Sequence, residues 1–239
     1  MKNLQFRPTS FIFFVAAVSL LAVIAACSSS EPTPVPVQPE ITAAEAVELS
    51  KIAMSELESF RFNLMHESGH TTLSSALELT VAGGIVTSNG LDLKAEANIG
   101  RAFVRVEAIV IDEQTWMTNP LTGVWSEIPP EDSPFSFLDP VKLVADILGE
   151  TQHPVYPDDS ATNGDIKVSG QIPAPTLAAL VGTVDPDAIP GVVLTFDPDD
   201  FLLKKIVISG IVQPEDEETY VRVITLSEFD KPVSLEPPI

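Results

Sequence analysis

The chain has 239 residues, 45% of them apolar, which suits one domain or two small ones with a buried core. Its formal charge is −21, from 34 acidic and 13 basic residues. Because nucleic-acid binding depends on Lys and Arg side chains that neutralise phosphates, this charge argues against a nucleic-acid partner. It also disfavours a domain that lies flat on an anionic membrane surface.

The first 27 residues have the pattern of a bacterial export signal. Lys2 and Arg7 precede an apolar run over 11–26 that is broken only by Ser19 and ends at Cys27. A basic start followed by an apolar segment and small residues is typical of a signal peptide that is removed. The last four residues, IAAC, resemble the bacterial lipobox, whose cysteine is acylated before the chain is cut. Residues 1–26 are therefore predicted to be a lipoprotein signal peptide, and Cys27 the site of lipid attachment.

Two other interpretations of this segment remain open. An uncleaved transmembrane helix is one, although the run is short for about 30 Å of hydrocarbon. Ordinary secretory cleavage is the other, and it would leave the only cysteine as an unpaired extracellular thiol. Removing the signal leaves 11 basic and 34 acidic residues, a formal charge of −23.

Residues 27–40 are expected to be the lipidated cysteine and a tether. The stretch 28–40 contains four prolines and three serines and has no helical or strand period. Pro-rich chain is a semi-rigid spacer that extends about 3.1 Å per residue, so it would hold a domain up to roughly 40 Å from the membrane. The folded domain is predicted to comprise residues 41–239.

The clearest predicted helix covers 41–60. Thr42 and Glu45 have the spacing of a capping box at its start. Its apolar positions recur every three or four residues, as on one face of an amphipathic helix: Ala46, Leu49, Ala53, Leu57 and Phe60. Shorter helices are predicted over 139–149, where Pro140 lies near the start, and over 175–181.

From residue 61 onward the apolar residues alternate with period two, which predicts antiparallel strands. Trp116 and Trp125 flank a turn over 119–123 and predict a hairpin, and a second hairpin is expected around the acidic turn 197–200. The expected strands are 61–67, 74–82, 84–88, 91–97, 101–111, 115–118, 166–172, 192–196, 203–209 and 220–226, followed by an extended tail over 229–239.

About ten antiparallel strands with a few amphipathic helices predict an α+β fold, in which helices cover one face of a large curved sheet. A sheet of this size begins to curl, and a curled sheet under helices tends to enclose a hollow. A hollow lined by Leu, Val, Ile and Phe would suit a lipid. Alternation by itself does not distinguish such a hollow from a filled core.

His66, Glu67 and His70 form a literal H-E-x-x-H motif. Zinc peptidases need this motif on a helix, which places both imidazoles on one face. Here the flanks are strand-like, and Ser68 and Gly69 favour a turn. We therefore interpret the motif as a polar turn between two strands, with a zinc hydrolase as the least favoured alternative. The acidic sequences 185–187 and 197–200 lack the glycine and glutamate of an EF-hand and are interpreted as turns.

The order of segments along the chain resembles a known family. After the lipobox and Pro-rich spacer come AEAVELSKIAMSELESFRFNL, TWMTNPLTGVWSEIP, PVKLVADILGE, DIKVSGQIPAPTLAALVG, IPGVVLTFDPDDFLLKKIVISG and YVRVITLSEFDKPVSLEPP. Together these are similar to the LppX/LprA/LprF/LprG lipoprotein family, which has a LolA-like fold. The resemblance implies a half-barrel of antiparallel strands under helices, an apolar cavity between them, and binding or carriage of acylated lipids or glycolipids. It carries over no catalytic residue, and its lipidated cysteine matches Cys27.

The sequence thus predicts a non-enzymatic lipoprotein on the extracytoplasmic side of the cell membrane, with no cofactor or metal. Its expected partners are a lipid or glycolipid ligand and the membrane that holds the Cys27 anchor. The residues expected to line the cavity from the helical roof are Leu57, Phe60, Val141, Val144 and Leu148. The alternative is a surface scaffold or adhesion lipoprotein whose core is filled.

Overall fold

The computed structural model describes residues 41–74, 77–112, 114–129, 132–133, 137–159, 161–162 and 164–238. The predicted signal peptide, Cys27 and the tether lie outside these residues. All described residues belong to one compact unit, Pro36–Ile239. Within them, no helix is both long and apolar enough to cross a membrane.

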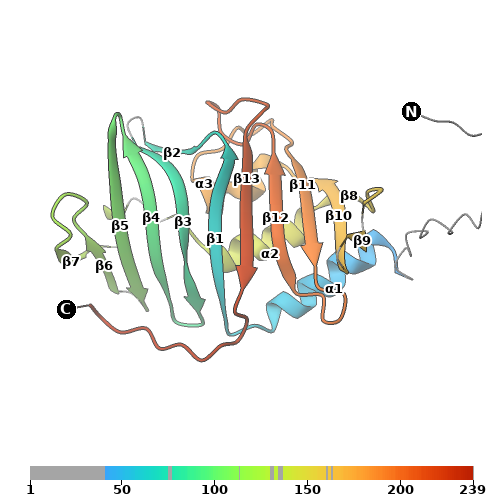
Figure 1. The fold of residues 1–239 in the computed structure, drawn as a ribbon, viewed down its shortest axis with the longest axis horizontal. Helices are drawn as coiled ribbons and strands as arrows, with labels where there is room; N and C mark the ends of the chain where they lie inside the picture. Colours follow the sequence, from blue (N-terminus) through green and yellow to red (C-terminus); the bar gives the residue numbers. More distant parts are fainter. Residues whose placement is uncertain are drawn as a thin grey trace, which may run out of the picture. The chain divides into compact units, whose positions relative to one another are not determined.

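Thirteen strands of the described chain form one antiparallel sheet, with β1 (Ser59–Ser68) at the middle of the strand order (Figure 1). On one side of β1 lies the β3–β7 half: β3 (Leu77–Thr87), β4 (Gly90–Ile99), β5 (Ala102–Ile111), β6 (Gln114–Thr118) and β7 (Trp125–Ile128). On the other side lies the β13–β8 half: β13 (Val221–Ser227), β12 (Leu203–Ser209), β11 (Gly191–Phe196), β10 (Asp165–Gln171) and β8 (Gln152–Val155). The short strands β2 (Thr71–Ser74) and β9 (Ala161–Thr162) pair with β3 and β10.

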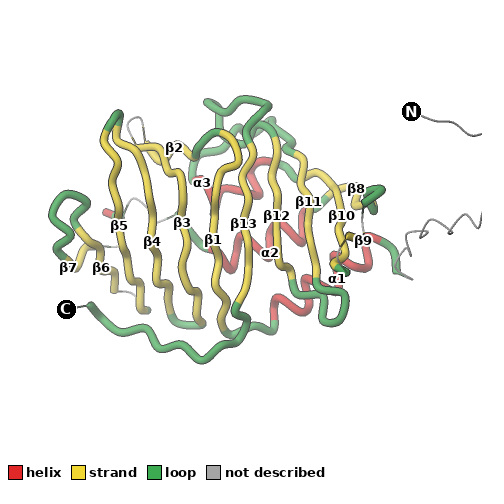
Figure 2. The backbone as a smooth tube through the Cα atoms, in the orientation of Figure 1, coloured by secondary structure: helices red, strands yellow, loops and turns green. Residues whose placement is uncertain are grey.

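Helices α1 (Ala43–Ser55), α2 (Pro140–Glu150) and α3 (Ala178–Val181) pack on one face of this sheet. The 3-10 helix η2 (Ala174–Leu177) leads directly into α3. Figure 2 shows these helices in red behind β1 and the β13–β8 half, and none of the three lies over β5, β6 or β7. The predicted α+β fold with a curved antiparallel sheet is confirmed, and the sheet is open because its end strands β7 and β8 do not pair with each other.

The first helix is shorter than predicted. It begins at the expected capping box of Thr42 and Glu45 but ends at Ser55, and Phe60 belongs to β1. The backbone N–H groups of Glu58 and Ser59 donate to Asp230 Oδ1, at 2.7 and 3.2 Å. A contact with the distant C-terminal tail therefore replaces the next helical turn. The helix also buries a different face from the one predicted: Ala43, Ala46, Val47, Ser50 and Met54.

The two strands predicted over 74–82 and 84–88 are one strand, β3, which continues through Gly83 and Gly84. A Cβ atom on Gly84 would lie 1.8 Å from the backbone oxygen of Asp92 on β4. The glycine therefore permits a close approach of two strands and does not mark a turn. The predicted helix over 139–149 and both predicted hairpins are confirmed by α2, by β6 with β7 and by β11 with β12.

Candidate functional site

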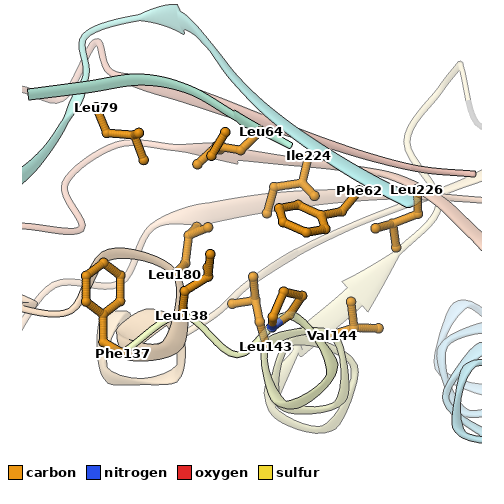
Figure 3. A pocket seen from close by; sticks show the side chains of 12 residues that line it. Phe62, Leu64, Leu79, Phe137, Leu138, Leu143, Val144, Leu180, Ile224 and Leu226 are labelled. Carbon is orange, nitrogen blue, oxygen red and sulfur yellow. The ribbon is translucent and has the colours of Figure 1, made fainter. Parts of the chain in front are cut away.

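A narrow apolar hollow lies between the middle of the sheet and the helices. Figure 3 shows Phe62, Leu64 and Ile224 facing Leu143 and Leu180 across it. The space open to the centre of a water molecule is about 20 Å³, which is little more than one water needs. In this conformation the hollow is closed. Its described lining is wholly apolar: Phe62, Leu64, Leu79, Ala82, Phe137, Leu138, Pro140, Leu143, Val144, Leu180, Ile224 and Leu226.

A wider hollow lies beside it, over the β3–β7 half. Its volume is about 630 Å³, within the 300–1,000 Å³ that is usual for small-molecule sites. The two hollows share Leu138 and Pro140, so they meet at the start of α2. The described lining of the wide hollow is Val86, Thr87, Gly90, Leu91, Leu93, Ala108, Val110, Thr115, Ser133, Leu138, Asp139, Pro140 and Val141.

The wide hollow has no cation in its described lining, and Asp139 is the ionisable group at its border. The Asp139 carboxylate accepts a hydrogen bond of 2.9 Å from the backbone N–H of Lys142 and so caps α2. The Lys142 ammonium forms an ion pair with Asp146 on the next turn of the helix. The hollow therefore suits apolar chains and uncharged groups, and it offers no counter-ion to an anionic head group.

Small side chains occur on the inner face of the β3–β7 half, and Ala108 among them lines the wide hollow. On the inner face of β3, β4 and β5, Ala82 pairs with Ala95, and Leu93 lies between Gly84 and Ala108. Across the sheet, Phe196, Ile206 and Ile208 on β11 and β12 are fully buried. Alternating burial continues through both halves, and the inner face of the β3–β7 half combines these small residues with Val86, Leu91 and Val110.

The start of α2 and the end of α3 are joined where the two hollows meet. The backbone N–H of Asp139 donates to the Ala179 carbonyl at 3.3 Å. Phe137 packs against Gly182, which ends α3 with φ of 75° and where an added Cβ would lie 3.2 Å from the ring. The start of α2 is therefore held to the end of α3 by one backbone hydrogen bond and one ring contact.

The structure brings part of the predicted roof to these hollows. Val144 lines the narrow hollow, and Val141, which is 55% exposed, borders the wide one. Leu148 is buried on α2 but lies outside both linings. Leu57 is partly buried between α1 and β1, and Phe60 is buried in β1 opposite Val86. These side chains therefore do not form one continuous roof.

Sequence reasoning missed the floor of the site. Phe62, Leu64 and Leu79 line the narrow hollow from β1 and β3, and Ile224 and Leu226 line it from β13. The alternation of apolar residues in these strands showed that the five side chains share one face. The sequence did not show that β1 pairs with β13, at the far end of the chain.

A buried polar network closes one end of the site. Arg222 on β13 is fully buried, and its guanidinium donates to both oxygens of Asp216 at 2.7 and 2.9 Å. Arg222 also donates to the Thr71 hydroxyl and the His70 carbonyl, both at 3.0 Å. Burial alone raises the pKa of Asp216, but hydrogen bonds from Arg222 and two backbone N–H groups outweigh it and hold this pKa below its ordinary value.

Gln213 extends the network to the end of α3. Its side chain accepts from the Thr72 N–H and donates to the Thr72 carbonyl, both at 2.8 Å, and it donates to the Val181 carbonyl at 3.3 Å. Strand β2, helix α3 and the segment before β13 are thus joined through one buried amide. Because a buried polar group is stable only when it is hydrogen-bonded, this end of the fold is sensitive to any change in its partners.

The H-E-x-x-H motif is only partly the predicted turn: His66, Glu67 and Ser68 belong to β1, and the turn is Gly69, with φ of 78°, and His70, before β2 begins at Thr71. His66 Nδ1 lies 2.8 Å from the Thr80 carbonyl and Nε2 lies 3.0 Å from the Thr71 hydroxyl, so both ring nitrogens have protein partners.

Burial is the main reason that the pKa of His66 lies below its ordinary value. His70 lies beside Glu78 and the ring of Tyr220. Among the described residues, no group of three or more His, Cys, Asp and Glu side chains is placed to hold a metal ion.

Comparison with known proteins identifies relatives of this fold. The model of the LppX_LprAFG lipoprotein family matches residues 42–235. LprF from Mycobacterium bovis is similar in structure, with a TM-score of 0.59 and 20% identity over 82% of this chain and 96% of LprF. Lipoprotein LppX from Mycobacterium tuberculosis has a TM-score of 0.56 and 16% identity over 81% of this chain and 98% of LppX. The comparison with curated proteins finds no significant match.

Proposed function

The chain belongs to the LppX_LprAFG lipoprotein family, and from this premise we propose that it binds the acyl chains of a lipid or glycolipid in the two hollows. The observation that carries the proposal is the pairing of a wide hollow of about 630 Å³ with a narrow, wholly apolar one across the start of α2. Burying an acyl chain contributes about 0.8 kcal/mol per CH₂ group, so partial enclosure already gives useful affinity.

Binding proceeds in two steps in this proposal. An acyl chain first lies along the wide hollow against Leu91, Leu93 and Val110. The start of α2 then rotates about Pro140, and the chain end passes Leu138 into the widened space beneath Val144. Because the lining of the narrow hollow is wholly apolar, the acyl chain itself supplies the contacts that hold it open.

The proposal places the domain outside the cytoplasm on a membrane, held there by a lipid on Cys27 and by the tether over 28–40. The lipobox-like sequence supports the anchor, and the family is described as one of lipoproteins. We expect Cys27→Ser to abolish acylation. The chain should then either leave the membrane fraction or keep its uncleaved signal peptide. Mass spectrometry of the N-terminal peptide, with a normal acylated Cys27 in the wild type as reference, measures this directly.

We also propose that the protein carries its ligand without chemical change. The histidine best placed by sequence for catalysis, His66, has both ring nitrogens hydrogen-bonded within the fold. The narrow hollow presents almost only carbon, which suits shielding of acyl chains from water during transfer.

The test is extraction of non-covalent lipid from the purified full chain, followed by mass spectrometry. We expect about one acylated lipid per chain, and we expect Ala108→Phe, which fills the wide hollow, to remove most of it. The matched control is Ile109→Phe, on the next residue and the opposite face of β5, which should retain the lipid.

Equal lipid in the two variants would show that any lipid present lies outside the hollow and would contradict the proposal. A wild-type chain without bound lipid, which also takes up none when mixed with lipid vesicles, would favour the scaffold interpretation instead.

A further inference from the structure

The hairpin of β6 and β7 projects from the free edge of the sheet, away from the helices (Figure 1). All six residues of its tip, 119–124, are exposed. Leu121 is 86% exposed and Val124 is 63% exposed, the two largest fractions among the exposed large apolar side chains of the described residues. Exposed apolar side chains that gather at a projecting turn mark a contact surface more often than isolated ones do.

The charge pattern separates this hairpin from the rest of the chain. Residues 114–126 contain no charged side chain, although 20% of the chain is charged. Trp125 follows the tip directly and is half-buried. A tip without charge, followed by a tryptophan, has the composition of a segment that enters the boundary between lipid head groups and acyl chains.

The backbone N–H groups of the tip are satisfied within the turn. Asn119 Oδ1 accepts from the N–H groups of Leu121 and Thr122, at 2.9 and 3.2 Å. The Gly123 N–H donates to the Asn119 carbonyl, the Asn119 N–H donates to the Val124 carbonyl, and the Val124 N–H donates to the Thr122 hydroxyl. Since proline has no N–H, every backbone N–H from 119 to 124 has a partner inside the turn. These N–H groups therefore need neither water nor a protein partner when lipid surrounds the tip.

From these observations we infer that the β6–β7 tip, with Leu121 and Val124 at its end, inserts into the head-group region of a lipid bilayer. A bilayer fits better than a protein surface, because the tip offers apolar carbon and satisfied N–H groups but no charge and no free backbone donor for a partner. The inference deepens the proposed function, on which it rests for the presence of a nearby membrane. Thr115, on the same strand, lines the wide hollow. At about 3.4 Å per residue, the hollow lies within roughly 20 Å of the inserted tip.

Quenching of tryptophan fluorescence by brominated phosphatidylcholine tests the insertion. The full chain is reconstituted into vesicles of this lipid, and Trp125→Phe identifies the part of the signal that comes from the hairpin. Trp116, the other tryptophan, is buried. We expect Trp125 to be quenched, and we expect Leu121→Asp with Val124→Asp to reduce that quenching to roughly a third or less, since an aspartate enters a bilayer at a large cost.

The matched control is Val155→Asp with Ile189→Asp. These side chains are 58% and 56% exposed, and Val155 lies on β8 at the opposite end of the strand order. The control should keep the full quenching. Leu121→Ser with Val124→Ser gives a second, milder variant, and thermal unfolding of every variant shows that the fold is retained.

Unquenched Trp125 in chains that remain bound to the vesicles would overturn the inference, as would equal losses in tip and control variants. A tip variant that changes the chain from dimer to monomer in detergent would assign the tip to self-association and would also overturn it. Lipid extraction from the same samples reports on the hollow separately, so a failed insertion and an empty hollow are distinguishable.

Discussion

The two halves of the sheet face the interior with side chains of different size. In the β13–β8 half, Leu194, Phe196, Ile206 and Ile208 are fully buried against other side chains. In the β3–β7 half, Gly90 and Ala108 are among the residues that border a hollow of about 630 Å³. Both halves are built from antiparallel strands with the same alternation. The helices cover the β13–β8 half and leave β5, β6 and β7 uncovered (Figure 2), so one half is a filled frame and the other borders the site.

Strand β1 is the boundary between the halves. Phe62 lies between Gly84 on one neighbour and Leu226 on the other, and Leu64 lies between Ala82 and Ile224. The narrow hollow forms at this boundary, under α2. A ligand that enters from the open side therefore meets the filled side at β1, where further movement would require repacking of side chains that are already close-packed.

The largest effect is expected from the buried ion pair at the end of the filled half. Arg222→Met leaves the Asp216 carboxylate buried without its cation and leaves Thr71 and the His70 carbonyl without a donor. We expect a loss of about 3–5 kcal/mol in the free energy of unfolding, measured by urea denaturation. Arg222→Met with Asp216→Leu should recover part of the loss. A single variant as stable as the wild type would show that the network does not hold this end of the fold.

The same substitution in the two halves should have unequal costs. Leu203→Ala, in β12, removes a fully buried side chain and should lower the free energy of unfolding by about 2–5 kcal/mol. Leu91→Ala, in β4, removes a side chain that already borders the wide hollow and is only partly buried. We expect less than about 1.5 kcal/mol there. Equal losses would mean that the wide hollow is closed in solution and that the two halves do not differ.

Much of the fold could be predicted from the sequence, because local signals were strong. The capping box at Thr42, the Asp139 cap with Pro140 and the turns at 119–123 and 197–200 all act within a few residues. The errors arose where a distant contact decided the outcome. Asp230 accepts hydrogen bonds from the backbone N–H groups that follow α1. The backbone of Asp92 lies too close to Gly84 for a side chain at that position. Strands as short as β8 and β9 carry too few residues for alternation to be recognised.

The site was predicted less well than the fold. The volume of a hollow depends on how far side chains fill the space between elements. Alternation of apolar residues shows which face is inward but not how much space remains. Ala108 was the available signal, because one methyl group cannot fill the volume that a leucine fills elsewhere. Its meaning depends on the register that sets Leu93 beside Ala108, which the sequence alone did not reveal.

Enlarging one alanine at a packed position and one at the wide hollow tests the comparison with the opposite change. Ala174, on η2, is fully buried, so Ala174→Leu adds three carbon atoms to a packed space and should cost about 1–3 kcal/mol. Ala108→Leu extends into the wide hollow and should cost little, while it lowers the amount of bound lipid. Thermal unfolding and lipid extraction measure the two effects. A similar loss of stability in both variants would contradict an open space beside Ala108.

The smallest effect is expected from pH, through the network that joins β2 to the filled half. Because burial lowers the pKa of folded His66, the unfolded chain binds the proton more readily, and acid favours unfolding. The stabilisation is complete above the ordinary histidine pKa of about 6.5 and is lost as the pH falls from there toward the lowered value. Asp216, whose folded pKa is also lowered, keeps its contribution until the pH falls below its ordinary pKa of about 3.9.

We therefore expect His66→Gln to flatten the decline of the melting temperature between pH 7 and about pH 5, whereas His153→Gln, at an exposed position on β8, leaves the decline as it is. If the melting temperature of His66→Gln declines as that of the wild type does, another group causes the decline. His66 then does not contribute to the pH dependence of stability.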